Sequence, residues 1–191
     1  MKIGLYFGSF NPVHIGHMII AEHVVNHSDL KQVWFILSPQ NPLKPSNTLL
    51  NEYDRLHLLN IAIDDSEKFR AMDVEFKLPK PSYTITTLVY LEEKYPQHEF
   101  VVVMGSDSFT NLPKWKNYET LIKNYSFIIY QRPGFEINKE TAKSIHYQEL
   151  DAPLLDISAT FIRTQLNNKK GIKYLLPHGV YDEIELNKYF L

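Results

Sequence analysis

The chain has 191 residues, of which 44% are hydrophobic and 22% charged, and its formal net charge is −2. Such a composition is typical of a globular protein with a sizeable core, and a charge near zero gives no long-range attraction to nucleic acid. The absence of cysteine excludes disulfides, thiolate metal sites and a cysteine nucleophile. No apolar stretch approaches the roughly 20 residues that cross a bilayer, and the N-terminal apolar run is too short for a signal peptide. We therefore expect one cytoplasmic domain over residues 1–191, without membrane or nucleic-acid partners.

Strand-like and helix-like segments alternate along the chain. In chain order we expect a strand at 3–7, a helix at 17–26, a strand at 33–37, a proline-rich loop at 38–45, a helix from 51 to 63, a strand at 71–74, a helix at 83–95, strands at 100–104, 126–130 and 145–150, and helices from 158 and 177. This order predicts an α/β fold, a Rossmann-like, doubly wound, mostly parallel sheet with helices on both faces and a C-terminal helical part at about 157–191. In such a sheet ligands bind at the carboxyl ends of the strands, near the point where the strand order reverses.

The segment 8–17, with the sequence GSFNPVHIGH, follows the first predicted strand and leads into the first predicted helix. Small residues and a turn-forming Asn-Pro pair allow the backbone to approach a ligand, and His14 and His17 lie where the helix begins. A helix start offers unpaired N–H groups and the positive end of the helix dipole, and both bind phosphate. The segment therefore favours a site for nucleotide phosphates beside two imidazoles.

Two other interpretations fit the histidines taken alone. A His-x-x-His pair can simply cap a helix or lie on the surface. Zinc is disfavoured because it needs three or four ligands, the chain has no cysteine, and His23 and His27 lie further along the helix. The segment matches neither the dinucleotide-binding fingerprint nor the P-loop.

The segment resembles the signature S/T-x-D/N-P-x-H-x-G-H of the nucleotidyltransferase superfamily related to class I aminoacyl-tRNA synthetases. A second segment, 157–163 (ISATFIR), is similar to the I-S-S/T-x-x-I/L-R motif of the same superfamily. Two such motifs, far apart and in the right order, are more specific than either alone. The chain departs from the pattern at Phe7, Asn11 and Ala159, where glycine, aspartate and serine are common. Any role that needs a carboxylate at Asn11 is therefore not carried over.

Within that superfamily the chain resembles the bacterial nicotinate mononucleotide adenylyltransferases over residues 1 to about 185. The resemblance rests on four further segments: the loop 38–45, PSYT at 81–84, the G-S-D…L…W block at 105–115, and RPG at 132–134. It implies transfer of the adenylyl group of ATP to nicotinate mononucleotide, which gives nicotinate adenine dinucleotide and pyrophosphate in NAD biosynthesis. It also implies that Mg²⁺ enters with ATP, since we see no dedicated carboxylate cage and expect no metal bound by the protein alone.

The nucleophile in that reaction is a phosphate oxygen, which is already an anion at neutral pH and needs no general base. The protein must align the phosphates and offset the negative charge of the leaving pyrophosphate. We expect His17 to donate to the transition state and His14 to bind the phosphates, as the two catalytic residues. We expect Asp107 to accept from a ribose hydroxyl, with an N-cap role as the alternative. The whole ATP site is expected to comprise Gly8, Ser9, Phe10, His14, His17, Gly105, Asp107, Ile157, Ser158 and Arg163.

The acceptor requires a platform for its pyridine ring and positive potential for its carboxylate. Trp115 is expected to stack on the ring, with core packing as the alternative, and Tyr83 and Thr84 open a helix whose N–H groups face the carboxylate. For Lys44 a solvated position in its loop is equally compatible with the sequence. The whole acceptor site is expected to comprise Ser9, Lys44, Tyr83, Thr84, Trp115 and Arg132.

Three alternatives remain for the function: an adenylyltransferase specific for nicotinamide mononucleotide, a phosphopantetheine-type adenylyltransferase, and an inactive nucleotide sensor. Tyr83, Thr84, Asp107 and Trp115 disfavour the phosphopantetheine-type enzyme, and the intact motif residues disfavour the sensor. The sequence does not decide whether the protein forms a homo-oligomer. The main interpretation requires that segments 8–17 and 157–163 meet around one triphosphate.

Overall fold

The computed structural model describes residues 1–40 and 49–190. Six strands form one sheet in the order β3-β2-β1-β4-β5-β6, and each neighbouring pair is parallel. The strands are β1 (Lys2–Gly8), β2 (Gln32–Leu37), β3 (Phe69–Met72), β4 (Glu99–Gly105), β5 (Ser126–Tyr130) and β6 (Tyr147–Leu150). This is the strand order of the doubly wound Rossmann fold, so the predicted fold class is confirmed.

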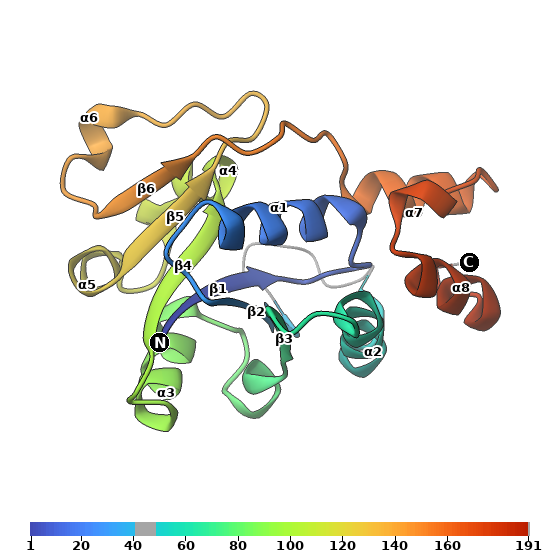
Figure 1. Cartoon of the computed structure of the whole chain (residues 1–191), viewed down its shortest axis with the longest axis horizontal. Coiled ribbons are helices and arrows are strands. Elements are labelled where there is room, and N and C mark those ends of the chain that lie inside the picture. Colours follow the sequence, from blue (N-terminus) through green and yellow to red (C-terminus); the bar gives the residue numbers. More distant parts are fainter. Residues whose placement is uncertain (41–48, 191) are drawn as a thin grey trace.

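Helices cover both faces of the sheet (Figure 1). They are α1 (Ile15–Asn26), α2 (Glu52–Ile63), α3 (Thr84–Lys94), α4 (Ser106–Thr110), α5 (Tyr118–Asn124), α6 (Lys139–Ala142), α7 (Ala159–Asn167) and α8 (His178–Asn187), with 3₁₀ turns η1 (Val74–Lys77), η2 (Leu112–Lys114) and η3 (Lys173–Leu175). No helix in the described ranges combines the length and the hydrophobicity that crossing a bilayer requires.

One predicted strand is displaced in the structure, and three short helices were not predicted. The strand expected at 71–74 lies at Phe69–Met72, because Val74 belongs to the 3₁₀ turn η1 instead. The short helices α4, α5 and α6 were not expected. They have five, seven and four residues, which is too short for a helical repeat of apolar positions to show.

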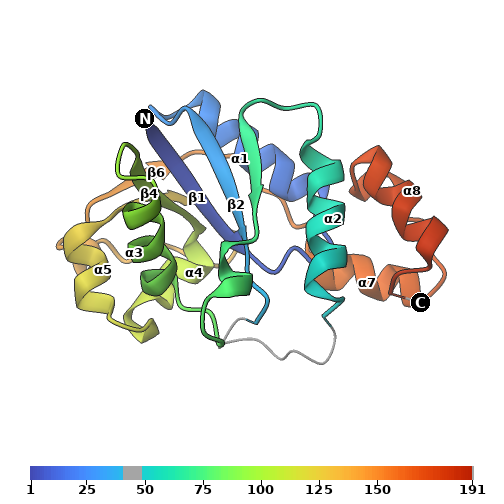
Figure 2. The same ribbon diagram turned by 90° about the horizontal axis from the view of Figure 1, so that it is seen from below.

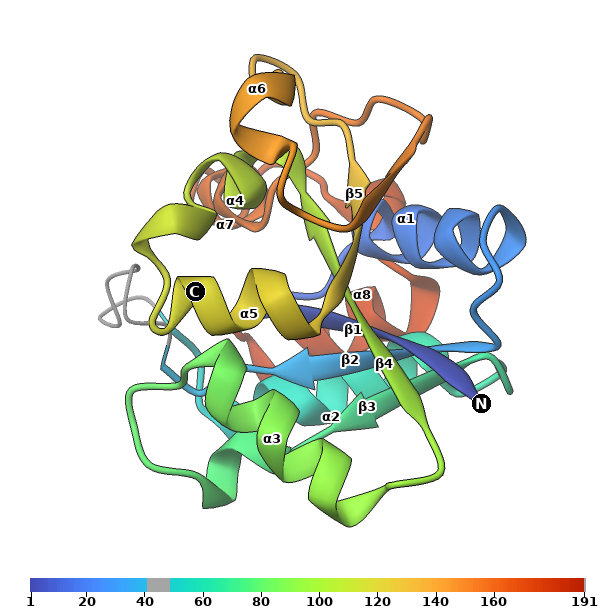
Figure 3. The ribbon, with the colours of Figure 1, turned by 90° about the vertical axis from the view of Figure 1, so that its left-hand side faces the viewer.

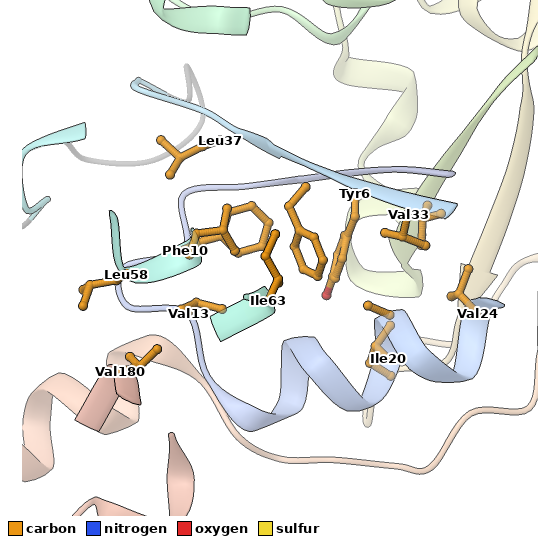
Figure 4. Close-up of a cluster of buried hydrophobic side chains, with 14 of the residues drawn as sticks. Tyr6, Phe10, Val13, Ile20, Val24, Val33, Leu37, Leu58, Ile63 and Val180 are labelled. Carbon is orange, nitrogen blue, oxygen red and sulfur yellow. The ribbon is translucent and has the colours of Figure 1, made fainter. Parts of the chain in front are cut away.

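Alternate residues of the strands enter two separate cores, one on each face of the sheet. Tyr6, Val33 and Val103 pack with α1, α2, α7 and α8, whereas Leu5 and Val102 pack with α3 and α5. Figure 4 shows the first of these cores, in which Tyr6 and Val33 from the strands meet Ile20 and Val24 from α1. Figure 3 shows α3 and α5 on the opposite side of the sheet from α1.

The order of the strands reverses between β1 and β4, which are neighbours at the centre of the sheet. The segment with the two histidines follows β1, and the Gly-Ser-Asp segment follows β4, so both flank this reversal. Beside the carboxyl end of β1 lies α7, and α2 packs next to α8 (Figures 1 and 2). Sequence segments from both ends of the chain therefore reach the edge at which this fold binds ligands.

Arg55 binds the loops that follow β1 and β2 at this edge of the sheet. The side chain lies in α2 with 1% of the residue exposed, and its guanidinium donates to four backbone carbonyl groups. These belong to Leu50 (2.8 Å), Ser9 (2.7 Å), Ser38 (2.9 Å) and Pro39 (3.3 Å). The loop after β1 and the loop after β2 are thus held against the same buried group.

An Arg55→Leu substitution is expected to lower the free energy of unfolding by at least about 3 kcal/mol, because it leaves four buried or half-buried carbonyls without a donor. Urea unfolding measures this effect. The control is Arg70→Leu, since Arg70 is exposed and only lies over the Trp34 ring at 5.3 Å, and its loss should cost less than about 1 kcal/mol. An Arg55→Leu protein as stable as the wild type would contradict the role of this side chain.

Candidate active site

The loop after β1 has an unusual backbone conformation at Phe10. Its φ is 44°, in the left-handed region that bulky residues rarely adopt, and its ring is buried with 2% exposure. The ring covers Gly8 so closely that a Cβ there would lie 2.8 Å from Phe10 Cζ, and it packs edge-on against the ring of His17 at 5.1 Å. Because the Phe10 side chain is in the core, only the backbone of this residue can face a nucleotide.

His14 and His17 form one hydrogen-bonded pair at the start of α1. His14 is the N-cap residue, and its backbone N–H donates to Nδ1 of His17 at 3.2 Å. The two rings stack with their centroids 3.7 Å apart. Since Nδ1 of His17 accepts a hydrogen bond, the neutral ring carries its proton on Nε2. The fold thus makes the half-buried His17 a hydrogen-bond donor through Nε2.

His14 is neutral at physiological pH. Burial and the nearby positive charge of Arg132 lower the pKa of its imidazole from 6.5 to about 4. Its Nδ1 is buried and has no hydrogen-bond partner within residues 1–40 and 49–190. A buried polar atom without a partner is uncommon in folded proteins and fits a group that meets a ligand.

The two motif segments, far apart in the sequence, meet as expected. Nη1 of Arg163 in α7 donates to the backbone carbonyl of Asn11 at 2.7 Å. A Cβ at Gly16 in α1 would lie 3.7 Å from Cβ of Ile157. Ser158 is the N-cap of α7, and its hydroxyl oxygen accepts from the Phe161 N–H at 3.1 Å. The starts of α1 and α7 and the Arg163 guanidinium therefore border the same region.

Asn11 has a structural role that asparagine can fill. Its side-chain oxygen accepts a hydrogen bond from the backbone N–H of Leu50 at 3.0 Å, and the residue is 2% exposed. The departure from aspartate thus preserves an acceptor oxygen at this position.

On the other side of the strand reversal, Asp107 and Arg132 lie together. Oδ1 of Asp107 is 3.9 Å from Nε of Arg132, and both side chains are about one-third exposed, at 39% and 33%. Gly105 permits this approach, because a Cβ there would collide with the Asp107 carboxylate and lie 2.9 Å from Cγ of Arg132. The N-cap of α4 is Gly105, so the alternative that Asp107 caps this helix is wrong. The structure places Arg132, expected in the acceptor set, beside a residue of the expected ATP set.

Beneath this pair the hydroxyl groups of Tyr6 and Tyr130 are joined by a buried 3.0 Å hydrogen bond. Burial raises the pKa of both phenols, so both stay protonated at neutral pH. The two tyrosines thus place uncharged, hydrogen-bonded hydroxyl groups in the buried region beside the strand reversal.

The residues expected at the acceptor nucleotide lie around the start of α3. Tyr83 is the N-cap residue of this helix and Thr84 its first residue. Trp115 ends the turn η2, is half-buried and packs against the core on the α3 side of the sheet. Lys116, which the sequence analysis did not select, places its ammonium group 4.3 Å from the centre of the Tyr83 ring. Lys44 lies outside the described residues.

The sequence analysis did not select three charged residues that make contacts in or near the site: Arg55, Lys116 and the buried Glu75. Arg55 and Glu75 appear as ordinary charged residues in polar segments, and only long-range packing shows that they are buried. Lys116 follows the selected Trp115, so its position was the one signal available. Within the described ranges no group of three or more His, Asp or Glu side chains could hold a metal ion.

The lowered pKa of His14 makes stability depend on pH. The unfolded chain binds a proton at His14 with a pKa near 6.5 and the folded protein with a pKa of about 4, so the contribution is present above pH 6.5 and is lost as the pH falls toward 4. Between pH 7 and pH 4.5 the loss should be about 2 kcal/mol. Urea unfolding of His14→Gln should show a correspondingly smaller difference between these pH values. An equal difference in both proteins would contradict a neutral, buried His14.

Comparison with known proteins agrees with this geometry. The cytidylyltransferase-like family model matches residues 5–165. The probable nicotinate-nucleotide adenylyltransferase of Flavobacterium psychrophilum is 47% identical, with 100% of this chain and 99% of the relative covered, and that of Cytophaga hutchinsonii is 46% identical with 100% and 98% covered. The nicotinic acid mononucleotide adenylyltransferase of Plasmodium falciparum, solved in complex with NaAD, has the same fold with a TM-score of 0.85 at 23% identity over 99% of this chain and 97% of that one. The chain belongs to the nicotinate-nucleotide adenylyltransferase family of cytidylyltransferase-like proteins.

Proposed function

We propose that this protein transfers the adenylyl group of ATP to nicotinate mononucleotide and releases pyrophosphate. One observation carries the proposal: Arg163 binds the Asn11 carbonyl at 2.7 Å, which joins the late motif to the segment that presents His14 and His17. Family membership supports the choice of reaction, and the relatives named for nicotinate nucleotides favour this acceptor over phosphopantetheine.

In this reaction a 5′-phosphate oxygen of the acceptor attacks the α-phosphorus of ATP. A new P–O bond forms, the bond to the β-phosphate oxygen breaks, and pyrophosphate leaves with the electron pair. The attacking oxygen is already anionic, so neither histidine has to remove a proton. The neutral state of His14 fits a role in binding phosphate, in which no proton is transferred.

The chain supplies donors for the charge that develops on the leaving group. His17 carries a proton on Nε2, and the first N–H groups of α7 and the Arg163 guanidinium border the loop that leads to it. Ser158 uses its oxygen as a cap acceptor, which leaves its hydroxyl hydrogen to donate to a phosphate. We propose that Mg²⁺ arrives bound to the triphosphate, which needs no cage of protein carboxylates.

The acceptor is held around the start of α3. Trp115 offers an indole face for the electron-poor pyridine ring, and the N–H groups at the start of α3, with the Thr84 hydroxyl, face the nicotinate carboxylate. The Lys116 ammonium beside Tyr83 adds positive potential there. We further propose that the protein works in the cytoplasm, which its lack of cysteine fits.

Pyrophosphate release from ATP tests this function directly. Nicotinate mononucleotide should be turned over, and nicotinamide mononucleotide should be a poorer acceptor, because the carboxylate alone is attracted by Lys116 and the helix start. A Lys116→Met substitution should reduce the preference for the acid by about three- to tenfold. ATP binding without turnover of either acceptor would favour the sensor instead, and an unchanged preference in Lys116→Met would exclude Lys116 from the discrimination.

Removing the imidazole of His17 should impair chemistry rather than folding. His17→Ala is expected to lower kcat by about 10² to 10³-fold, the usual loss for one donor to a developing charge. Thermal unfolding followed by circular dichroism checks that the fold is intact. His23→Ala in the same helix is the matched control and should keep kcat within about twofold. Full activity in His17→Ala would refute the proposed role.

A further inference from the structure

Glu75 carries a buried carboxyl group that the proposed reaction does not use. It lies in η1, between β3 and α3, with 1% of the residue exposed. Its Oε1 accepts a 2.7 Å hydrogen bond from the hydroxyl of Thr87, which is also 1% exposed. Burying a carboxyl group away from water costs free energy, and an apolar side chain would fill the same space without this cost. The carboxyl group at this position therefore indicates a hydrogen-bonding role.

The second oxygen of Glu75 adjoins the segment that opens α3. Within the described residues Oε2 of Glu75 and Oγ of Ser82 are both buried, and neither has a hydrogen-bond partner. Burial raises the pKa of the Glu75 carboxyl, and the side chains of Thr87, Ser38 and Ser82 lower it, which places these hydroxyls around the group. A rotation of the Ser82 side chain would satisfy both unpaired atoms at once.

Ser82 is itself fixed to the loop after β2. Its backbone N–H donates to the carbonyl of Gln40 at 3.1 Å, and the next residue, Tyr83, is the N-cap of α3. Glu75 therefore contacts the start of α3 from two directions, through Thr87 in its first turn and Ser82 just before its N-cap. These contacts determine where the first N–H groups of the helix point.

We propose that Glu75 is a positioning residue for the acceptor nucleotide, which holds the start of α3 through Thr87 and Ser82 so that its N–H groups meet the nicotinate carboxylate. The inference rests on the proposed function, in which those N–H groups take that carboxylate. Glu75 touches neither substrate. The groups expected to bind ATP lie around the starts of α1, α4 and α7, and neither Thr87 nor Ser82 is among them, so the effect of Glu75 falls on the acceptor alone.

Steady-state kinetics with both substrates tests this role. Glu75→Ala should raise KM for nicotinate mononucleotide about tenfold and leave kcat and KM for ATP within about twofold. Glu75→Gln should stay within about threefold of the wild type, because its amide oxygen still accepts from Thr87 and its NH₂ group can donate to Ser82. Glu92→Ala is the matched control, since it removes a carboxylate of α3 that binds Tyr125 at 2.8 Å, and all three constants should be unchanged.

A parallel rise of both KM values, an unchanged KM for the acceptor, or a Gln variant as impaired as the Ala variant would overturn the inference. If Glu75→Ala does not fold, Thr87→Val decides: it removes the donor to Glu75 and must raise KM for nicotinate mononucleotide alone. A wild-type protein without turnover would overturn the proposed function and this inference with it. An active wild type with unaltered variants would overturn the inference only.

Discussion

The buried guanidinium of Arg55 is the constraint on which the ligand-binding edge depends. Its donors are directed in a fixed plane, so the carbonyls of Leu50, Ser9, Ser38 and Pro39 must occupy set positions around it. Ser9 belongs to the loop that leads to the histidines, and Pro39 precedes Gln40, which holds Ser82. One side chain thus fixes the loop that leads to the histidines relative to the loop that holds Ser82. In the proposed reaction these two loops border the two substrates, which must meet in line.

The electrostatics of the site follow from the same arrangement. Cationic groups and helix starts surround the region, while burial beside Arg132 lowers the pKa of His14 and keeps its imidazole uncharged at neutral pH. A neutral imidazole can bind phosphate without adding to the positive charge that Arg163 already supplies. A limited positive charge suits a site that binds a triphosphate and then releases pyrophosphate. Additional charge that bound the substrate and the transition state equally well would not speed the reaction.

Local patterns in the sequence were sufficient for most of the fold. Apolar runs marked the four central strands β1, β2, β4 and β5, since parallel strands covered on both faces are continuously hydrophobic. The edge strands β3 and β6 contain exposed polar residues, and their bounds were less well predicted. The signal for the helix that begins after His14 was also local, because a turn and two polar residues precede an apolar stretch. By contrast, α4 and α5 have too few turns to show a repeat. The cap at Gly105 was missed because a backbone conformation, not a polar side chain, begins that helix.

The long-range features had no local signal. Arg55 is buried by carbonyls from segments 5 to 46 residues away, and the partner of the Asn11 side chain is 39 residues away. The meeting of Arg163 with Asn11 followed only from the family resemblance of two separate motifs. Patterns of charge and hydropathy reflect only residues that are close in the sequence. These contacts instead join segments that the fold brings together.

The hydrogen bond between Arg163 and Asn11 spans 152 positions of the chain. The contact between the two motif segments can therefore form only after synthesis of the chain has passed residue 163. In the proposed function the nucleotide contacts both segments, so its binding free energy would add to the stability of the fold that brings them together.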